Sequence, residues 1–296
     1  MQGQLFTQDF LLHGIRQTPP YEGLDAATLQ GFESGLRAIF AELDAASSLN
    51  EAQTEQLVIE RMLVLLGWGS DYLPQVNLSH KRREDVPDIL LFADSAAHTA
   101  ALAEAKDERR YRHGIAILEA KRWLRPLDRG SDTEANDPGA PSSQMLRYLS
   151  RAEISSERAV KWGLLTNGGT WRLYWQDARS RAEEFFEVDV AALLGVPGVP
   201  ADLEGLDAKH GLKLLFLLFN RVAFLTQTWD NANRSFHAYA LNEARVYEER
   251  VSQDLGRRVF DEIFPSLAQA LAAGDLQAEK EKVGYGQFTQ IGRAHV

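Results

Sequence analysis

Two short apolar runs, VPDILLF (residues 86–92) and IAILEAK (residues 115–121), decide the fold of this chain. Each is bounded by charged or turn-forming residues, a pattern that predicts a buried β-strand. Side chains alternate along a strand, so Glu119 and Lys121 are expected on the same face. Antiparallel pairing of the two strands would bring Asp88 close to that face. Two carboxylates that converge beside a lysine favour Mg²⁺ and an oriented water molecule, which is the chemistry of phosphodiester hydrolysis.

These residues resemble the PD-(D/E)XK nuclease signature, with Pro87-Asp88 as its first half and Glu119-Ala120-Lys121 as its second. The resemblance implies an α/β fold, a restriction-endonuclease-like core with a mixed sheet flanked by helices. It also implies that Asp88, Glu119 and Lys121 are catalytic, and that Asp88 and Glu119 hold Mg²⁺. A second copy, Glu104-Ala105-Lys106, lies in an alanine-rich, charged run that favours a helix. We therefore interpret that copy as part of a helical insertion between the two strands.

The clearest predicted helix runs from Asn50, which can cap it, to Trp68. Its expected apolar face consists of Leu57, Met62, Leu63, Leu65 and Leu66. The stretch is similar to the first helix of type I and type IIG restriction nucleases, and this similarity gives a helix glutamate a supporting role at the metal. Glu51 fits that role best and Glu55 second. The alternative is that both are ordinary first-turn acids, favoured by the helix dipole.

A predicted helix from Gln144 to about Ser156 places Gln144 and Tyr148 on one face. In type I and type IIG nucleases a Gln-X-X-X-Tyr motif lies next to the site and near the DNA backbone, and a hairpin follows it. Residues 160–175 predict such a hairpin, with an Asn-Gly turn. Further strands are expected near residues 72–78 and 184–190. The resemblance thus implies that Gln144 and Tyr148 contact DNA.

The charge pattern indicates where DNA could bind. The chain has a net charge of −10, which argues against non-specific nucleic-acid binding by its whole surface. Basic residues nevertheless cluster on either side of the predicted site, where phosphates need positive charge. The clusters are Lys81, Arg82 and Arg83; Arg122, Arg125 and Arg129; and Arg147, Arg151, Arg158 and Lys161. Of these, we assign Arg122 and Arg147 to DNA contacts.

The composition excludes several kinds of functional site and indicates the cellular compartment. The sequence contains no cysteine, which excludes disulfides, zinc fingers and thiol nucleophiles. The first residues lack the features of a signal peptide, and no apolar run is long enough to span a bilayer. We therefore expect a cytoplasmic protein with no membrane partner.

We expect four parts along the chain. A helical N-terminal segment (1–48) contains a turn at Thr18–Tyr21 and a helix near Asp25–Leu43. The nuclease domain (49–195) includes a loop at 128–141. A helical spacer (196–290) follows a Gly- and Pro-containing linker, with helices near 213–225 and 242–271. The last part, IGRAHV (291–296), back-translates to a sequence resembling a common sequencing adapter, so we expect a non-native tail and a natural protein that continues further.

The first hypothesis is a Mg²⁺-dependent DNA endonuclease domain at the N-terminus of a type IIG-like restriction–modification protein that defends against phage. In type IIG enzymes a helical spacer joins the nuclease to a methyltransferase, so the expected partners are double-stranded DNA and C-terminal methyltransferase and target-recognition regions. The alternative is a non-cutting DNA-binding module, or an accessory module of a DNA adenine methyltransferase. The intact Asp88, Glu119 and Lys121 set favours cutting, because paired carboxylates are costly to keep without a metal.

Overall fold

The structure is a computed structural model that describes residues 1–78, 86–128, 139–200, 203 and 206–271. One compact unit runs from Met1 to Arg245, and a second unit begins at Val246. Neither unit begins or ends near residue 48 or residue 195. The expected N-terminal segment and the first part of the expected spacer therefore belong to the same compact unit as the sheet.

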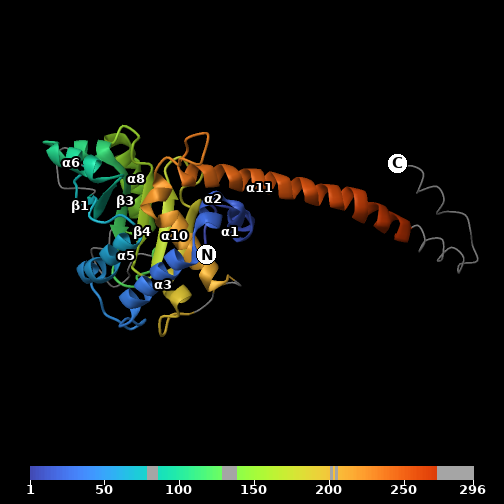
Figure 1. Ribbon diagram of the computed structural model, residues 1–296, viewed down its shortest axis with the longest axis horizontal. Coiled ribbons are helices and arrows are strands. Elements are labelled where there is room, and N and C mark those ends of the chain that lie inside the picture. The colour runs from blue at the N-terminus through green and yellow to red at the C-terminus, as the bar shows by residue number, and fades with distance from the viewer. Residues whose placement is uncertain (79–85, 129–138, 201–202, 204–205, 272–296) are drawn as a thin grey trace, which may run out of the picture. The chain divides into compact units, whose positions relative to one another are not determined.

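A six-stranded mixed sheet forms the centre of the first unit (Figure 1), and its strands lie in the order in which they occur in the chain. Every neighbouring pair is antiparallel except β3 and β4, which are parallel. The strands are β1 (Tyr72–Pro74), β2 (Ile89–Phe92), β3 (Gly114–Ala120), β4 (Trp162–Thr166), β5 (Thr170–Trp175) and β6 (Phe185–Asp189). A mixed sheet flanked by helices confirms the predicted α/β class. The first strand is shorter than the predicted 72–78.

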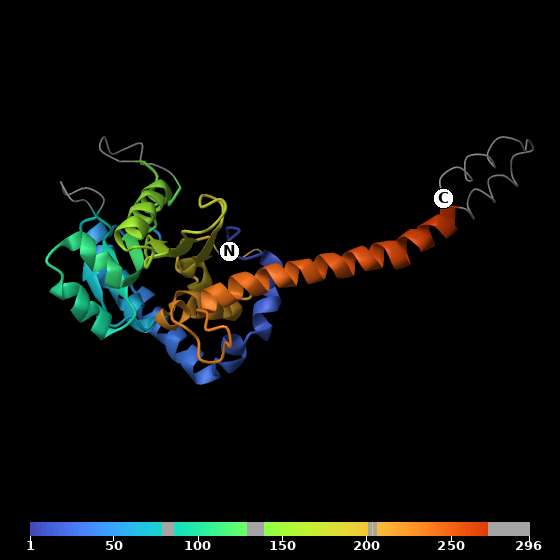
Figure 2. The ribbon, with the colours of Figure 1, turned by 90° about the horizontal axis from the view of Figure 1, so that it is seen from above.

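Helices cover both faces of this sheet. Those that precede it or lie between its first strands are α1 (Gln8–Leu12), η1 (Gly14–Gln17), α2 (Pro19–Gly23), α3 (Ala26–Phe40), α4 (Glu51–Thr54), η2 (Glu55–Ile59), α5 (Glu60–Leu65), α6 (Ser95–Ala103), α7 (Asp107–Arg110) and η3 (Tyr111–His113). The later ones are α8 (Pro141–Ser155), α9 (Val190–Leu194), α10 (Ala208–Phe219), η4 (Arg221–Phe224), α11 (Phe236–Arg258) and η5 (Val259–Ile263). Figure 2 shows α8 and α3 on opposite sides of the sheet.

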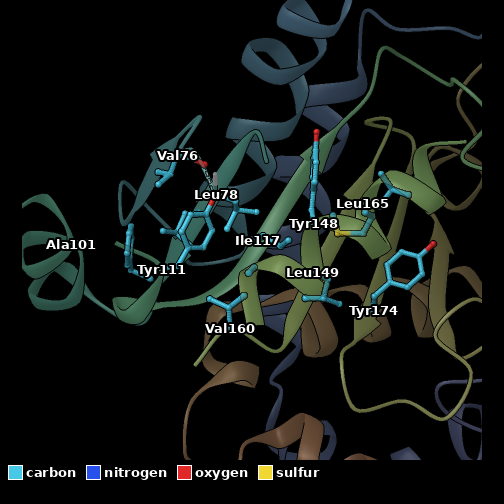
Figure 3. Close-up of a cluster of buried hydrophobic side chains, with 14 of the residues drawn as sticks. Val76, Leu78, Ala101, Tyr111, Ile117, Tyr148, Leu149, Val160, Leu165 and Tyr174 are labelled. Atoms are coloured by element: carbon cyan, nitrogen blue, oxygen red, sulfur yellow. Dashed lines mark hydrogen bonds between the residues drawn. The ribbon is translucent and has the colours of Figure 1, made fainter. Parts of the chain in front are cut away.

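The connection between β3 and β4 explains why α8 lies where it does. Parallel neighbours require a crossover connection, and α8 supplies it. Met145 and Leu149 of α8 pack on Gly163 of β4, where even an added Cβ would meet the sulfur of Met145. Around this contact a buried apolar cluster joins α8 to the sheet, and Figure 3 shows ten of its residues labelled: Val76, Leu78, Ala101, Tyr111, Ile117, Tyr148, Leu149, Val160, Leu165 and Tyr174. The crossover helix is thereby fixed over β3 and β4.

The opposite face of the sheet packs on α10. Phe219, the last residue of α10, contacts Trp171 of β5 and Phe186 of β6, with ring centroids 5.8 and 6.0 Å apart. Phe216, one turn earlier, packs against Phe32 of α3 at 5.0 Å. Three layers therefore follow one another in the first unit: α8, the sheet, and then α10 with α3.

The helix predicted at 50–68 begins as expected, with a reciprocal cap. The Asn50 side chain accepts from the backbone N–H of Gln53, and the Gln53 side chain accepts from the backbone N–H of Asn50. The middle of the helix is wider, because η2 is a π-helical turn. The apolar face is therefore Val58, Ile59, Met62, Leu63 and Leu66. Leu57, predicted on that face, is 45% exposed, and that part of the prediction is wrong.

Other predicted boundaries also shift. Residues 19–23 form the short helix α2, with Pro19 in its first turn, instead of a turn at Thr18–Tyr21. The insertion between β2 and β3 is helical, as predicted. Glu104 and Lys106, however, have extended backbone between α6 and α7, so they do not lie on a helix. The helix predicted from Gln144 begins three residues earlier, at Pro141.

The second unit begins within α11, whose last buried side chain is Ala244. From residue 246 to 271 the described chain is helical. In the described part of the chain, no helix combines the length and apolar character needed to cross a bilayer. Residues 81–83, Arg129 and the predicted tail at 291–296 lie outside the described residues.

Candidate active site

The antiparallel pairing of β2 and β3 brings the predicted acids together. The last pair in the register is Ile89 with Leu118, so Asp88 lies opposite Glu119. The Ala120 N–H donates to Asp88 Oδ2 at 2.7 Å, and this bond fixes the carboxyl group against the end of β3. The two acids come from opposite ends of an insertion, and only the strand pairing makes them neighbours.

Glu119 and Lys121 lie on the face of the sheet covered by α8. The Lys121 ammonium donates to Glu119 Oε1 at 2.6 Å, and both side chains are almost fully buried. No described residue donates a hydrogen bond to the other oxygen of this carboxyl, Oε2, although it is buried. A buried carboxyl oxygen without a donor is unusual, because most buried polar atoms have a partner.

Burial and mutual repulsion shape the charge of the site. Burial first and the neighbouring Asp88 carboxylate second raise the pKa of Glu119 to about 8, against the opposing charge and hydrogen bond of Lys121. Burial also raises the pKa of Asp88 above its ordinary value. For Lys121, burial lowers the pKa, but the surrounding carboxylates of Glu119, Glu51 and Asp88 more than offset this and raise it. The site is therefore a cluster of acidic side chains around the single ammonium group of Lys121.

Both candidate glutamates, Glu51 of α4 and Glu55 of η2, face Asp88, Glu119 and Lys121. Glu51 Oε1 lies 3.9 Å from Lys121 Nζ, and its side chain is about half exposed. Partial burial raises the pKa of Glu55 to about 7, with further contributions from Asp88 and Glu51. Since Glu51 reaches Lys121 and Glu55 interacts with Asp88, the structure brings both to the site and does not choose between them.

Gln144 and Tyr148 are paired on α8, as their spacing predicted. Gln144 Nε2 donates to the Tyr148 hydroxyl at 2.8 Å. Burial raises the pKa of Tyr148, and Glu119 contributes to the increase, so the phenol lies near the acidic group. Figure 3 shows the Tyr148 hydroxyl pointing away from the apolar cluster that holds its ring. Arg147 lies over the same ring at 5.4 Å, and Arg122 is exposed directly after Lys121.

A second polar group on the same face was not predicted. Arg172 of β5 is 2% exposed and donates to Asp128 through both terminal nitrogens, at 2.7 and 2.8 Å. It also donates to Glu187 and to the Tyr174 hydroxyl. Asp128 belongs to the segment that follows Lys121, so this network fastens the segment to the sheet. The only sequence signal was a charged residue inside an aromatic strand.

The donor set at the acidic group fits a hard divalent cation in part. Among the described residues, no three His, Asp or Glu side chains are grouped as a ready-made metal site. Asp88 and Glu119 do provide two adjacent carboxyls, with Oε2 of Glu119 free of protein donors. Carboxylate oxygens are the ligands that Mg²⁺ prefers, and Mg²⁺ usually keeps several waters and takes only one or two carboxylates. Two carboxyls therefore suffice.

Comparisons with known proteins give no relative. No protein-family model matches the chain, no curated protein matches it, and no solved structure matches its fold.

Proposed function

We propose that this chain carries a Mg²⁺-dependent DNA endonuclease of the PD-(D/E)XK class. The observation that supports the proposal is the convergence of Asp88, Glu119 and Lys121. They lie at the adjoining ends of the paired strands β2 and β3 in a buried, acidic site, and one Glu119 oxygen lacks a donor. A purely structural role would not require two adjacent buried carboxyls, one of which has a pKa raised to about 8 by burial and by its neighbour.

The residues would divide the work as follows. Asp88 and Glu119 would hold the cation, which when bound would neutralise phosphate charge and favour attack by water. Lys121 is held as a cation by its neighbours, so it would orient the attacking water and oppose developing negative charge instead of removing a proton. Gln144 and Tyr148 would contact the DNA backbone next to the cut. The expected products carry 5′-phosphate and 3′-hydroxyl ends.

The wider assignment follows from the same resemblance. The nuclease would be the N-terminal part of a type IIG-like restriction–modification protein, in which α11 and the residues after it lead toward methyltransferase and target-recognition regions. Double-stranded DNA is the substrate, and the cytoplasm is where such an enzyme meets it.

The test is a plasmid-cutting assay with the full chain in excess over DNA, so that weak binding does not limit the rate. Wild-type protein should cut only with Mg²⁺ or Mn²⁺. Lys121→Ala should reduce the rate by roughly 10²–10⁴-fold, the range expected for a group that acts on the attacking water. Lys106→Ala, in the second copy of the motif, is the matched control and should cut at the wild-type rate. Equal rates for wild type and Lys121→Ala, or cutting that needs no divalent cation, would contradict the proposal.

A further inference from the structure

The chain leaves the sheet immediately after Lys121, and Trp123 anchors it two residues later. Trp123 is buried there, and its backbone N–H donates to Thr54 Oγ1 at 2.9 Å. The indole N–H of the same residue donates to the Asp44 carbonyl at 2.8 Å. The backbone that follows the lysine is therefore held by groups from earlier in the chain.

Thr54 makes this connection from inside the helix that carries the two candidate glutamates. Its hydroxyl donates to the Asn50 carbonyl at 2.8 Å and accepts from Trp123. Its side chain is fully buried, directly before Glu55 and three residues after Glu51. The Thr54 hydroxyl thus joins α4, the first turn of the helix that carries Glu51 and Glu55, to the segment that follows β3.

The turn between β4 and β5 closes over the same joint. Gly168 has φ +83, and a Cβ added to it would lie 3.0 Å from the Thr54 methyl carbon and 3.0 Å from the Trp123 ring. A side chain would therefore be strained there and would also press on both partners. Three separate elements meet around the Thr54 side chain.

We propose that Thr54 is a positioning residue, which sets Glu51 and Glu55 relative to Lys121 by joining their helix to the backbone at Trp123. The consequence for the reaction rests on the proposed function. Lys121 Nζ and Glu51 Oε1 are 3.9 Å apart, so a small displacement of the helix changes that contact directly. Misplacement by about 1 Å is enough to reduce a reaction rate on the order of 100-fold.

Three variants of the full chain test the proposal. Thr54→Val keeps the shape but removes the hydroxyl, and Thr54→Ser keeps the hydroxyl but removes the methyl group. Thr99→Val is the matched control, because Thr99 also donates to a carbonyl four residues earlier, Ser95, but on an exposed helix. The first measurement is amide hydrogen exchange at Trp123, with the Lys121 amide, which donates to the Thr166 carbonyl at 2.7 Å, as the internal reference.

Exchange at Trp123 should accelerate by at least about 10-fold in Thr54→Val and stay near wild type in Thr54→Ser and Thr99→Val. The second measurement is the cutting rate with saturating Mg²⁺ and DNA. It should fall by roughly 10- to 100-fold in Thr54→Val, with little change in the DNA concentration that gives half the maximal rate, and recover in Thr54→Ser.

Each result decides something. Unchanged exchange at Trp123 in Thr54→Val would overturn the proposal whatever the activity. Faster exchange with wild-type cutting would also overturn it, since the connection would then be irrelevant to the site. Equal loss in Thr54→Val, which keeps a methyl group, and in Thr54→Ser, which keeps the hydroxyl, would show that the hydroxyl by itself does not position the helix and would overturn the proposal too. If wild-type protein cuts no DNA, the proposed function fails, and exchange at Trp123 still decides whether the Thr54 hydroxyl holds the backbone that follows Lys121.

Discussion

Replacing Glu119 by glutamine should stabilise the protein while it abolishes cutting. The pKa of Glu119 is about 8 in the fold and 4.5 in the unfolded chain. Between these values the folded state binds a proton that the unfolded state releases, so stability falls as pH rises from 4.5 toward 8. Each pH unit costs about 1.4 kcal/mol, and pH 7 lies about 2.5 units above 4.5, so the cost at pH 7 is about 3 kcal/mol. Glutamine matches the protonated acid in shape and does not titrate.

Urea unfolding from pH 5 to pH 8 in metal-free buffer measures this effect. The free energy of unfolding of Glu119→Gln should exceed that of wild type by an amount that grows with pH, reaching about 3 kcal/mol at pH 7. Glu22→Gln, at an exposed position of α2, is the control, and its curve should run parallel to that of wild type. Parallel curves for Glu119→Gln and wild type would refute the reasoning, because ionising the buried Glu119 carboxyl would then not lower the free energy of unfolding.

Three further predictions concern the cation, acid and DNA. Mg²⁺ at 100 times its dissociation constant should stabilise the folded protein by about 2.7 kcal/mol and so raise its melting temperature, and Asp88→Asn should remove most of this increase. An equal increase in both proteins would place the ion elsewhere. Burial lowers the pKa of His237 from 6.5 to about 4, so the neutral imidazole stabilises the fold fully above pH 6.5. As pH falls through 4 this stabilisation is lost, and the free energy of unfolding decreases by about 3 kcal/mol in all. In urea unfolding, His237→Gln should lose this acid dependence, and a variant that keeps it would exclude His237 as the cause. Binding of residues 1–290 to unrelated duplexes should be weak, strongly salt-dependent and indifferent to sequence, and a titration that shows tight, salt-resistant binding to one duplex would contradict this.

Local patterns were sufficient to predict the elements that carry the site. Alternation along residues 115–121 placed Glu119 and Lys121 on one face, and antiparallel pairing placed Asp88 beside them, as the structure shows. The Asn-Gly hairpin and the cap at Asn50 were also predictable, because each depends on residues within a few positions of one another.

Features that depend on distant partners were not predictable. Thr54 and Arg172 have no unusual local sequence, and their roles arise from Trp123 and Asp128, which are 69 and 44 positions away. Glu104 was assigned to a helix from composition, but the chain is extended there between two short helices. Helix propensity is a weak preference, which tertiary contacts override.

The π-helical turn at Glu55–Ile59 affects how the sequence can change over evolutionary time. Such a turn holds one residue more than an α-helical turn, so the helix before it is rotated by about 100° relative to an uninterrupted helix. The residues after the turn are fixed by burial of Met62, Leu63 and Leu66. Loss of a single codon here would leave the buried half unchanged and swing Glu51 away from Lys121. Related genes should therefore tolerate substitutions in this helix more readily than changes in its length.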